Sequence, residues 1–253
     1  MIKKNILSKI CPVVLAAGKG TRIREVNKNK TKVMLTLGAR PMCSYILERL
    51  KKIGFTKPFI VIGHKSEQIK NYFNNSCNYI LQTKRLGTGH AAKVILKNIN
   101  NNYQSLMIFM GDDSAFYTEE TLNKFILDFL KNKAVISFMV TTSNDKTVGR
   151  VVQDEKGNIV KVIEKEELIP EYYQKYKLVN TAGYLFDISW IRKNINKLEK
   201  HIPKGEYYLP DLIKIAIEQN EKVIGFKIPK NEWFGINTPE QYNLANKIFL
   251  TKK

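Results

Sequence analysis

Hydrophobic and polar positions in the first 140 residues alternate between short, mainly apolar runs and longer amphipathic segments. Runs of four to eight apolar residues bounded by turn residues are typical of buried strands. They predict strands at 13–17, 59–62, 78–82, 106–110 and 135–140, with helices between them at 41–53, 67–73, 91–99 and 118–131. This alternation predicts an α/β fold with a mostly parallel sheet, flanked by helices on both faces.

The second half of the chain has a different pattern. Residues 150–164 alternate about a turn at Glu155-Lys-Gly-Asn, which predicts a β-hairpin. Two further strands and three helices are expected after it, at 179–186 and 222–228, and at 189–198, 208–218 and beyond Pro239. Neither a flexible linker nor an internal repeat divides the sequence, so we expect one domain over 1–253, with halves at about 1–140 and 141–253.

Composition excludes several classes of protein. At 43% hydrophobic and 26% charged over 253 residues, the chain can bury a substantial core. The longest apolar runs, 11–17 and 134–140, are about a third of the roughly 20 residues that a membrane span needs. Lys9 and Pro12 interrupt the only stretch that imitates a signal peptide. Three scattered cysteines show no disulfide or zinc spacing, so a cytoplasmic protein is expected.

The net charge is strongly positive, because 42 Lys and Arg residues face 23 Asp and Glu, giving +19. Only seven of the basic residues are arginine, and the lysines are dispersed along the chain. Nucleic-acid-binding proteins concentrate Arg and aromatic residues on one face, so we expect no nucleic-acid partner. The positive field is instead suited to attracting phosphorylated small molecules.

A glycine-rich loop, Leu15-Ala-Ala-Gly-Lys-Gly-Thr-Arg22, directly follows the first predicted strand. Gly18 and Gly20 allow close backbone approach, and consecutive N–H groups in such a loop can hold phosphate oxygens, with charge from Lys19 and Arg22. The loop is not a dinucleotide-binding fingerprint, since Ile23 stands where the third glycine belongs, and it is not a Walker A loop. Taken alone, the Gly-x-Gly pattern could also be an ordinary turn in which the basic residues have no function.

Motifs further along the chain extend this signal over nearly its whole length. They are Lys32-Val-Met-Leu, Leu81-Gln-Thr-Lys-Arg-Leu-Gly-Thr-Gly-His90, Met110-Gly-Asp112, Gly149-Arg150, Val162-Ile-Glu164-Lys165, Val179-Asn180-Thr181, Gly205-Glu-Tyr-Tyr208 and Phe234-Gly-Ile-Asn237-Thr238. In this order they resemble the nucleoside-diphosphate-sugar pyrophosphorylases, the sugar-1-phosphate nucleotidyltransferases. The resemblance is closest to the uridyltransferase domain of bacterial N-acetylglucosamine-1-phosphate uridyltransferases.

This resemblance implies a single Rossmann-like nucleotidyltransferase domain. No left-handed β-helix domain is expected, because the hexapeptide repeats would begin after about residue 250.

The resemblance assigns roles that fit the chemistry of nucleotidyl transfer. An acceptor phosphate oxygen attacks the α-phosphorus of a nucleoside triphosphate in line, so catalysis comes from positioning and charge neutralisation. Asp112 and Asn237 correspond to ligands of Mg²⁺, which prefers hard oxygen donors. Taken alone, an aspartate at a strand end is more often a cap or a turn residue.

Two basic residues correspond to the family's catalytic cations. Arg22 would brace the triphosphate, and Lys32 the α-phosphate and the acceptor phosphate. The segment 23–31 between them is about three residues longer than usual, and Thr31 stands where a proline precedes the lysine. Lys28 and Lys30 are therefore competing candidates.

The nucleotide would bind to the glycine loop and the segment that begins at Gln82. Leu15, Ala16, Ala17, Gly18, Lys19, Gly20, Gln82, Gly87 and Thr88 match nucleotide-binding positions. A Gln amide can accept from a cytosine amino group or donate to a uracil carbonyl by turning over, so Gln82 favours a pyrimidine without deciding between CTP and UTP. His90, in the same segment, is interpreted as a structural residue.

The acceptor side matches the family less closely. Gly149, Glu164 and Asn180 correspond to positions that hold the sugar. The departures are Met110 in place of a tyrosine, Asp113-Ser-Ala in place of an apolar-proline pair, Ala182-Gly183 in place of glycine, and Pro210 in place of threonine. Asp113 is interpreted either as a partner for an ammonium group on the acceptor or as an ordinary loop acid.

These observations together predict a Mg²⁺-dependent nucleotidyltransferase that acts on small phosphorylated metabolites. The altered acceptor positions and the Lys- and Asn-rich composition are similar to cytidylyltransferases that couple CTP to phosphoglutamine in capsule biosynthesis, so transfer of CMP is the favoured reading. The alternative is a UTP-dependent sugar-1-phosphate uridylyltransferase. A regulatory protein without activity is disfavoured, since Arg22, Asp112 and Asn237 are all present. The sequence predicts no membrane partner and does not distinguish a monomer from a homo-oligomer.

Overall fold

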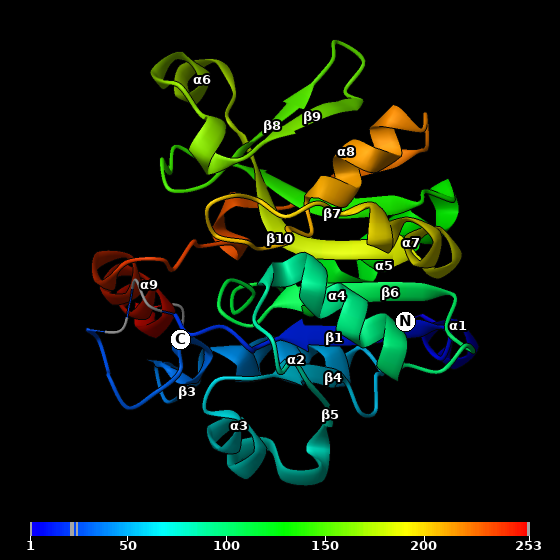
Figure 1. Cartoon of the computed structure of the whole chain (residues 1–253). Coiled ribbons are helices and arrows are strands. Elements are labelled where there is room, and N and C mark those ends of the chain that lie inside the picture. The colour runs from blue at the N-terminus through cyan, green and yellow to red at the C-terminus, as the bar shows by residue number, and fades with distance from the viewer. Residues whose placement is uncertain (1, 21–22, 24, 252–253) are drawn as a thin grey trace.

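The computed structural model describes residues 2–20, 23 and 25–251, and Figure 1 shows its fold. A central seven-stranded sheet has the order β11-β7-β10-β6-β1-β4-β5. Its strands are β1 (Ile10–Leu15), β4 (Phe59–Ile62), β5 (Asn78–Leu81), β6 (Ser105–Met110), β7 (Ile136–Thr142), β10 (Leu178–Asp187) and β11 (Val223–Lys227). Two small hairpins, β2 (Thr36–Leu37) with β3 (Arg40–Pro41), and β8 (Arg150–Gln153) with β9 (Ile159–Ile163), lie outside it.

The sheet is mostly parallel, as the sequence predicts. β1 pairs in parallel with β4 and β6, β4 with β5, and β7 with β11. β10 is the exception and runs antiparallel to both β6 and β7. The chain leaves the sheet at the end of β7, forms the β8–β9 hairpin and α6 (Pro170–Lys175), and returns with Leu178 beside Thr142. It re-enters at the end it left, so β10 must run in the opposite direction.

Helices cover both faces of the sheet and divide the core into two layers. They are α1 (Lys4–Leu7), α2 (Met42–Lys52), α3 (Ser66–Phe73), α4 (Gly87–Asn98), α5 (Glu119–Asn132), α7 (Ile188–Asn194), α8 (Asp211–Glu218) and α9 (Pro239–Thr251). Because side chains of a strand alternate between faces, Val14 packs with α2 and α5, whereas Val13 and Leu15 pack with α4, α7 and α8. α5 lies within one residue of the helix predicted at 118–131, and the hydroxyl of its N-cap residue Thr118 accepts a bond from Thr121 N at 3.2 Å.

The C-terminal helix returns to the N-terminal half of the chain. In Figure 1, α9 lies beside β3, and its residues join a third apolar cluster with Leu37, Tyr45 and Phe116. The Tyr242 hydroxyl donates to Thr36 O at 2.6 Å, and Asn246 Oδ1 accepts from Gly38 N at 2.8 Å. This docking carries the segment just before α9, including Asn237, to the edge of the sheet where β1 ends.

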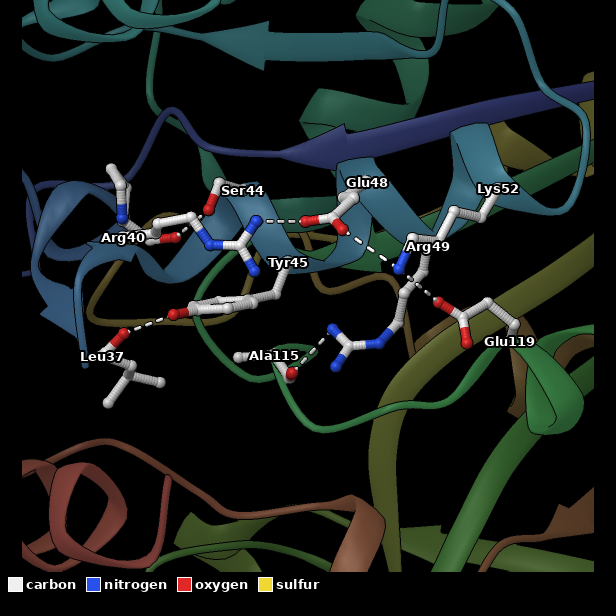
Figure 2. Close-up of polar contacts among 10 residues, drawn as sticks. Leu37, Arg40, Ser44, Tyr45, Glu48, Arg49, Lys52, Ala115 and Glu119 are labelled. Atoms are coloured by element: carbon white, nitrogen blue, oxygen red, sulfur yellow. Dashed lines mark hydrogen bonds and ion pairs between the residues drawn. The ribbon is translucent and has the colours of Figure 1, made fainter. Parts of the chain in front are cut away.

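The outer side of α2 carries a polar network that is shown in Figure 2. Arg40 pairs with Glu48, which also pairs with Lys52 at 3.1 Å, and Lys52 reaches Glu119 at 3.5 Å. Arg49 donates to Ala115 O at 2.9 Å. The network joins β3, α2 and the start of α5. Exposed pairs of this kind contribute little stability each, so we assign the network a local structural role.

Several element boundaries differ from the sequence-based prediction for identifiable reasons. α4 begins at Gly87 instead of residue 91, and α8 begins at Asp211 instead of 208. In both cases the shift comes from the docking of residues 205–209 against residues 86–89, a tertiary contact. α1, α6, β2 and β3 are short elements that the hydrophobic pattern did not predict. Among the described residues, no helix is both long and apolar enough to cross a lipid bilayer.

Candidate active site

A cleft with a volume of about 710 Å³ lies at the carboxyl ends of β1, β5 and β6. The chain continues from β1 to β4 and β5 on one side, and β6 lies on the other side of β1. This reversal of strand order is where open α/β sheets bind their ligands, because the loops after the two central strands diverge there.

The cleft collects all nine residues for which the sequence predicts nucleotide binding. Leu15, Ala16, Ala17, Gly18, Lys19, Gly20, Gln82, Gly87 and Thr88 line it, together with Lys32, Asp112 and Asn237. Sequence reasoning did not assign six further lining residues: Ile23, Val33, Arg85, Ala91, Glu206 and Tyr208. Val33, Arg85, Glu206 and Tyr208 belong to the motifs that carry the family resemblance, which is the signal that could have identified them. Arg22 lies outside the described residues.

The glycine loop is shaped to bring Lys32 against the backbone. Gly20 has a φ of +61°, and a Cβ built there would lie 2.4 Å from Lys32 Cβ. Only glycine therefore allows both this backbone conformation and this approach. Gly18, by contrast, has no heavy atom near the position of a Cβ, which leaves room at the loop for a ligand.

The Lys32 ammonium group lies between the two residues predicted to bind metal. Its Nζ is 2.5 Å from Asp112 Oδ2 and 3.3 Å from Asn237 Oδ1, and the Lys32 side chain is only 10% exposed. Two hard oxygen donors from distant parts of the chain thus converge on one cation. That donor set fits Mg²⁺, whose remaining positions would be filled by phosphate and water oxygens. Within the described residues, no group of three or more His, Cys, Asp and Glu side chains could hold a metal.

Hydrogen bonds hold the Asn237 segment in place from two directions. Asp113 Oδ1 accepts from Ile236 N at 3.5 Å, and Gln241 Oε1 accepts from Asn237 N at 2.7 Å. Gln241 Nε2 in turn donates to Asp145 Oδ2 at 2.9 Å. The contact to Ile236 supports the interpretation of Asp113 as a loop acid.

Of the three candidate lysines, only Lys32 lines the cleft. Lys28 and Lys30 are exposed, in a loop that packs against α3. Lys65 Nζ donates to Lys28 O at 2.9 Å, and Gln68 Nε2 donates to Asn29 O at 2.5 Å. The extra length of this segment is therefore absorbed on the surface of α3.

The opposite end of the cleft is formed where residues 205–209 dock against the start of α4. Tyr207 N donates to Leu86 O and Gly89 N to Tyr207 O, both at 2.8 Å. The Thr88 hydroxyl accepts from Leu209 N at 2.9 Å. Gln82, 5% exposed, closes this end from the position directly after β5. The segment that carries Gly87 and Thr88 is thus held by the second half of the chain.

The three residues predicted to bind the acceptor do not line this cleft. Asn180 is engaged internally, since its Nδ2 donates to the Tyr184 hydroxyl at 2.7 Å and its Oδ1 accepts from Ala182 N at 2.9 Å. Glu164 lines a separate cavity, also of about 710 Å³, between β9 and α8. Burial, reinforced by the Glu164 and Asp113 carboxylates, raises the pKa of Tyr184. Gly149 packs against the strand that precedes Glu164, where a Cβ would lie 2.4 Å from Ile163 O.

Comparison with known proteins shows the family to which this fold and this cleft belong. The chain belongs to the nucleotidyl transferase family, whose model matches residues 11–252. It is 30% identical to the bifunctional protein GlmU of Exiguobacterium sibiricum over 227 residues, which are 89% of this chain and 49% of that protein. It is also 30% identical to GlmU of Clostridium kluyveri over 241 residues, 94% of this chain and 52% of that one. The chain thus spans about half the length of these relatives.

A solved structure confirms the fold. A chain from Bacillus anthracis, provisionally described as a glucose-1-phosphate thymidylyltransferase in complex with sucrose, superimposes with a TM-score of 0.80. The match covers 95% of both chains at 19% sequence identity. The predicted single α/β domain with a mostly parallel sheet is therefore confirmed, and no β-helix domain is present in the described residues.

Proposed function

We propose that this protein is a Mg²⁺-dependent uridylyltransferase, which transfers UMP from UTP to a small phosphorylated acceptor of the sugar 1-phosphate class and releases pyrophosphate. The observation that carries the proposal is the arrangement of one cleft. Lys32, Asp112 and Asn237 converge at one end, and Gln82, Gly87 and Thr88 close the other. Such an arrangement can hold the phosphates and the base of one nucleotide at the same time.

In the proposed reaction, an oxygen of the acceptor phosphate bonds to the α-phosphorus while the bond to the bridging oxygen of pyrophosphate breaks. The N–H groups of residues 17–20 hold phosphate oxygens, since that of Ala16 donates to Val61 O, and Lys19 adds charge at the loop. Lys32 neutralises charge on the α-phosphate and the acceptor phosphate as they approach. Mg²⁺ held by Asp112 and Asn237 would neutralise and orient the phosphate oxygens. From the sequence alone, Arg22 is proposed to brace the leaving pyrophosphate.

We propose UTP as the nucleotide, whereas the sequence alone favours CTP. The chain is 30% identical to the GlmU proteins compared above, and the motifs that resemble the uridyltransferase domain cover the nucleotide end of the cleft. Gly149, Glu164 and Asn180 remain proposed acceptor residues in the half formed by 141–253. Binding of an acceptor by Asn180 would require its amide to exchange the contacts with Tyr184 and Ala182. We propose that the reaction takes place in the cytoplasm.

Transfer of CMP to an amino-acid-derived phosphate is the second candidate. It is favoured by Met110, which lines the cleft where related enzymes are expected to place a tyrosine hydroxyl. An apolar side chain at that position removes one hydrogen-bond partner for a sugar hydroxyl, and such a loss discriminates strongly between substrates.

One experiment separates these candidates. The purified protein is incubated with each of the four nucleoside triphosphates, Mg²⁺ and a panel of hexose 1-phosphates, hexosamine 1-phosphates and phosphorylated amino-acid derivatives, and pyrophosphate release is followed. Release with UTP and a sugar 1-phosphate, abolished by EDTA, is the expected result. Release only with CTP and an amino-acid-derived phosphate would establish the second candidate, and no release with any pair would refute both.

A further inference from the structure

The side-chain amide of Gln82 is held in one orientation. Its Nε2 donates to Gly87 O at 3.1 Å and lies 3.0 Å from His90 Nδ1. A backbone carbonyl can only accept, so the nitrogen end of the amide must face Gly87. The two N–H groups of the amide are then both used inside the protein. The carbonyl oxygen is the polar atom left for a ligand in the cleft that Gln82 lines.

His90 takes part in this arrangement only in one protonation state. Because the Gln82 nitrogen can only donate, His90 Nδ1 must accept, which requires a neutral ring with its proton on Nε2. Burial lowers the pKa of His90, and the positive charges of Lys93 and Lys97 on α4 and of Lys84 before it lower it further. The imidazole is therefore suited to remain an acceptor at neutral pH.

The orientation of this amide has a consequence for base recognition. Uracil carries an N–H at ring position 3 and a carbonyl at position 4, whereas cytosine carries a lone pair at position 3 and an amino group at position 4. The hydrogen-bonding polarity is thus opposite at both positions. An amide that can rotate satisfies either base, but a carbonyl fixed toward one ring position accepts from one base and repels the other.

We propose that His90 is a positioning residue that fixes the Gln82 amide and so makes the cleft discriminate between UTP and CTP. The preference for UTP itself rests on the proposed function, whereas the discrimination rests on the contacts of Gln82. This proposal goes beyond the sequence-based interpretation of His90 as a structural residue. His90 touches neither phosphates nor acceptor in this scheme and acts only through the amide of Gln82.

Nucleotide binding tests the proposal without any knowledge of the acceptor. A fluorescent UTP derivative labelled on the ribose is displaced with UTP or CTP in the presence of Mg²⁺, and the ratio of the two affinities is compared among variants. His90→Leu removes the acceptor at similar bulk, and we expect the ratio to fall about tenfold toward one. His90→Asn places an amide oxygen near the position of Nδ1 and should retain the wild-type ratio. Asn98→Ala, an exposed and uncharged change on the same helix, is the control and should also retain it.

The outcomes distinguish this inference from the proposed function. A His90→Leu protein with the wild-type ratio would overturn the inference, as would a His90→Asn protein that behaves like His90→Leu. A wild-type protein that prefers CTP would correct the nucleotide of the proposed function, and a collapse of that preference in His90→Leu would still support the role of His90. A wild-type protein that binds neither nucleotide would refute the proposed function and this inference with it. Thermal unfolding of each variant shows that the comparison is made on folded protein.

Discussion

Lys32 places a cation where Mg²⁺ is proposed to bind, since its Nζ lies 2.5 Å from Asp112 Oδ2 and 3.3 Å from Asn237 Oδ1. Two cations cannot share these oxygens at such distances without strong repulsion. Binding of a metal therefore requires the ammonium group to move, and the triphosphate offers it a new partner. Under the proposed function, nucleotide binding and metal binding would therefore be coupled at this single residue.

The coupling predicts that Lys32→Met binds a divalent cation more tightly in the absence of nucleotide. Removing the ammonium frees Asp112 and Asn237, and we expect the affinity for Mn²⁺ to rise about tenfold, whereas turnover falls because the phosphates lose a positive charge. Electron paramagnetic resonance of free Mn²⁺ measures the first effect without substrates. Lys28→Met, at an exposed lysine of the same loop, should leave the affinity unchanged. Equal Mn²⁺ affinity in wild type and Lys32→Met would contradict the competition.

Asp112 should be essential for turnover but not for the fold. The side chain is 24% exposed and follows β6, so its truncation removes little packing. We expect Asp112→Ala to lower kcat by at least about 1000-fold, because a carboxylate ligand of the metal is lost. Its unfolding temperature should stay within a few degrees of wild type. Retention of more than about a tenth of the activity would show that Asp112 is not a metal ligand.

At the scale of elements, the sequence predicts the strands well and the contacts between distant segments poorly. β4 is found at the predicted residues, since its apolar run is bounded by clear turn signals. The start of α4 is missed, because Gly87 and Gly89 indicate a loop until the backbone of Tyr207 is seen to pack on them. A Cβ on Gly89 would lie 3.1 Å from Tyr207 Cβ, and no local pattern encodes that partner.

In the candidate site, too, the position of residues next to strands was predictable, whereas the contacts between distant segments were not. The glycine loop and Asp112 stand next to strands, so their position at one edge of the sheet follows from the order of strands. The contact of Lys32 with Asn237 joins residues 205 positions apart, and only the docking of α9 creates it. Family resemblance identified Asn237, but neither hydrophobic periodicity nor spacing could have paired it with Lys32. The engagement of Asn180 by Tyr184 and Ala182 was equally invisible, since it lies at an irregularity in the pairing of β10 with β7.

The first turn of α9 links the Asn237 segment to the loop after β7. Gln241 accepts from Asn237 N with one end of its amide and donates to Asp145 Oδ2 with the other. Both ends of this amide are thus used to fix the backbone of a proposed metal ligand. Outer contacts of this type orient ligands, and their loss weakens metal sites by about 10- to 100-fold.

We therefore expect Gln241→Leu to raise the Mg²⁺ concentration needed for half-maximal activity about tenfold. Binding of UTP measured in EDTA should be unchanged, because Gln241 lies outside the lining of the cleft. Asn243→Ala, at an exposed position two residues further along α9, is the matched control and should alter neither quantity. A Gln241→Leu protein with a normal Mg²⁺ requirement would show that the Asn237 segment holds its shape without this link.

At the scale of the whole molecule, the two halves of the chain build the cleft together. The first half contributes the glycine loop, Gln82 and Asp112, whereas Glu206, Tyr208 and Asn237 come from the second. The hydrogen bonds between residues 86–89 and 205–209 are the direct connection at the base-reading end. Nucleotide affinity should accordingly depend on how closely these two segments pack.

Two glycines with similar φ angles allow this dependence to be tested. Gly87 has a φ of +89° and Gly157 a φ of +83°, so alanine at either position incurs a similar strain of roughly 1–2 kcal/mol. A Cβ at Gly87 would lie 2.4 Å from Tyr207 O, whereas at Gly157, in the β8–β9 turn, nothing lies within 4 Å.

We expect Gly157→Ala to lower the unfolding temperature by a few degrees without changing the Kd for UTP. Gly87→Ala should lower it further and weaken UTP binding at least about tenfold, because residues 205–209 are forced away from the start of α4. Calorimetric unfolding and titration of UTP measure both quantities, and equal effects of the two substitutions would mean that the contact between the halves does not shape the nucleotide site.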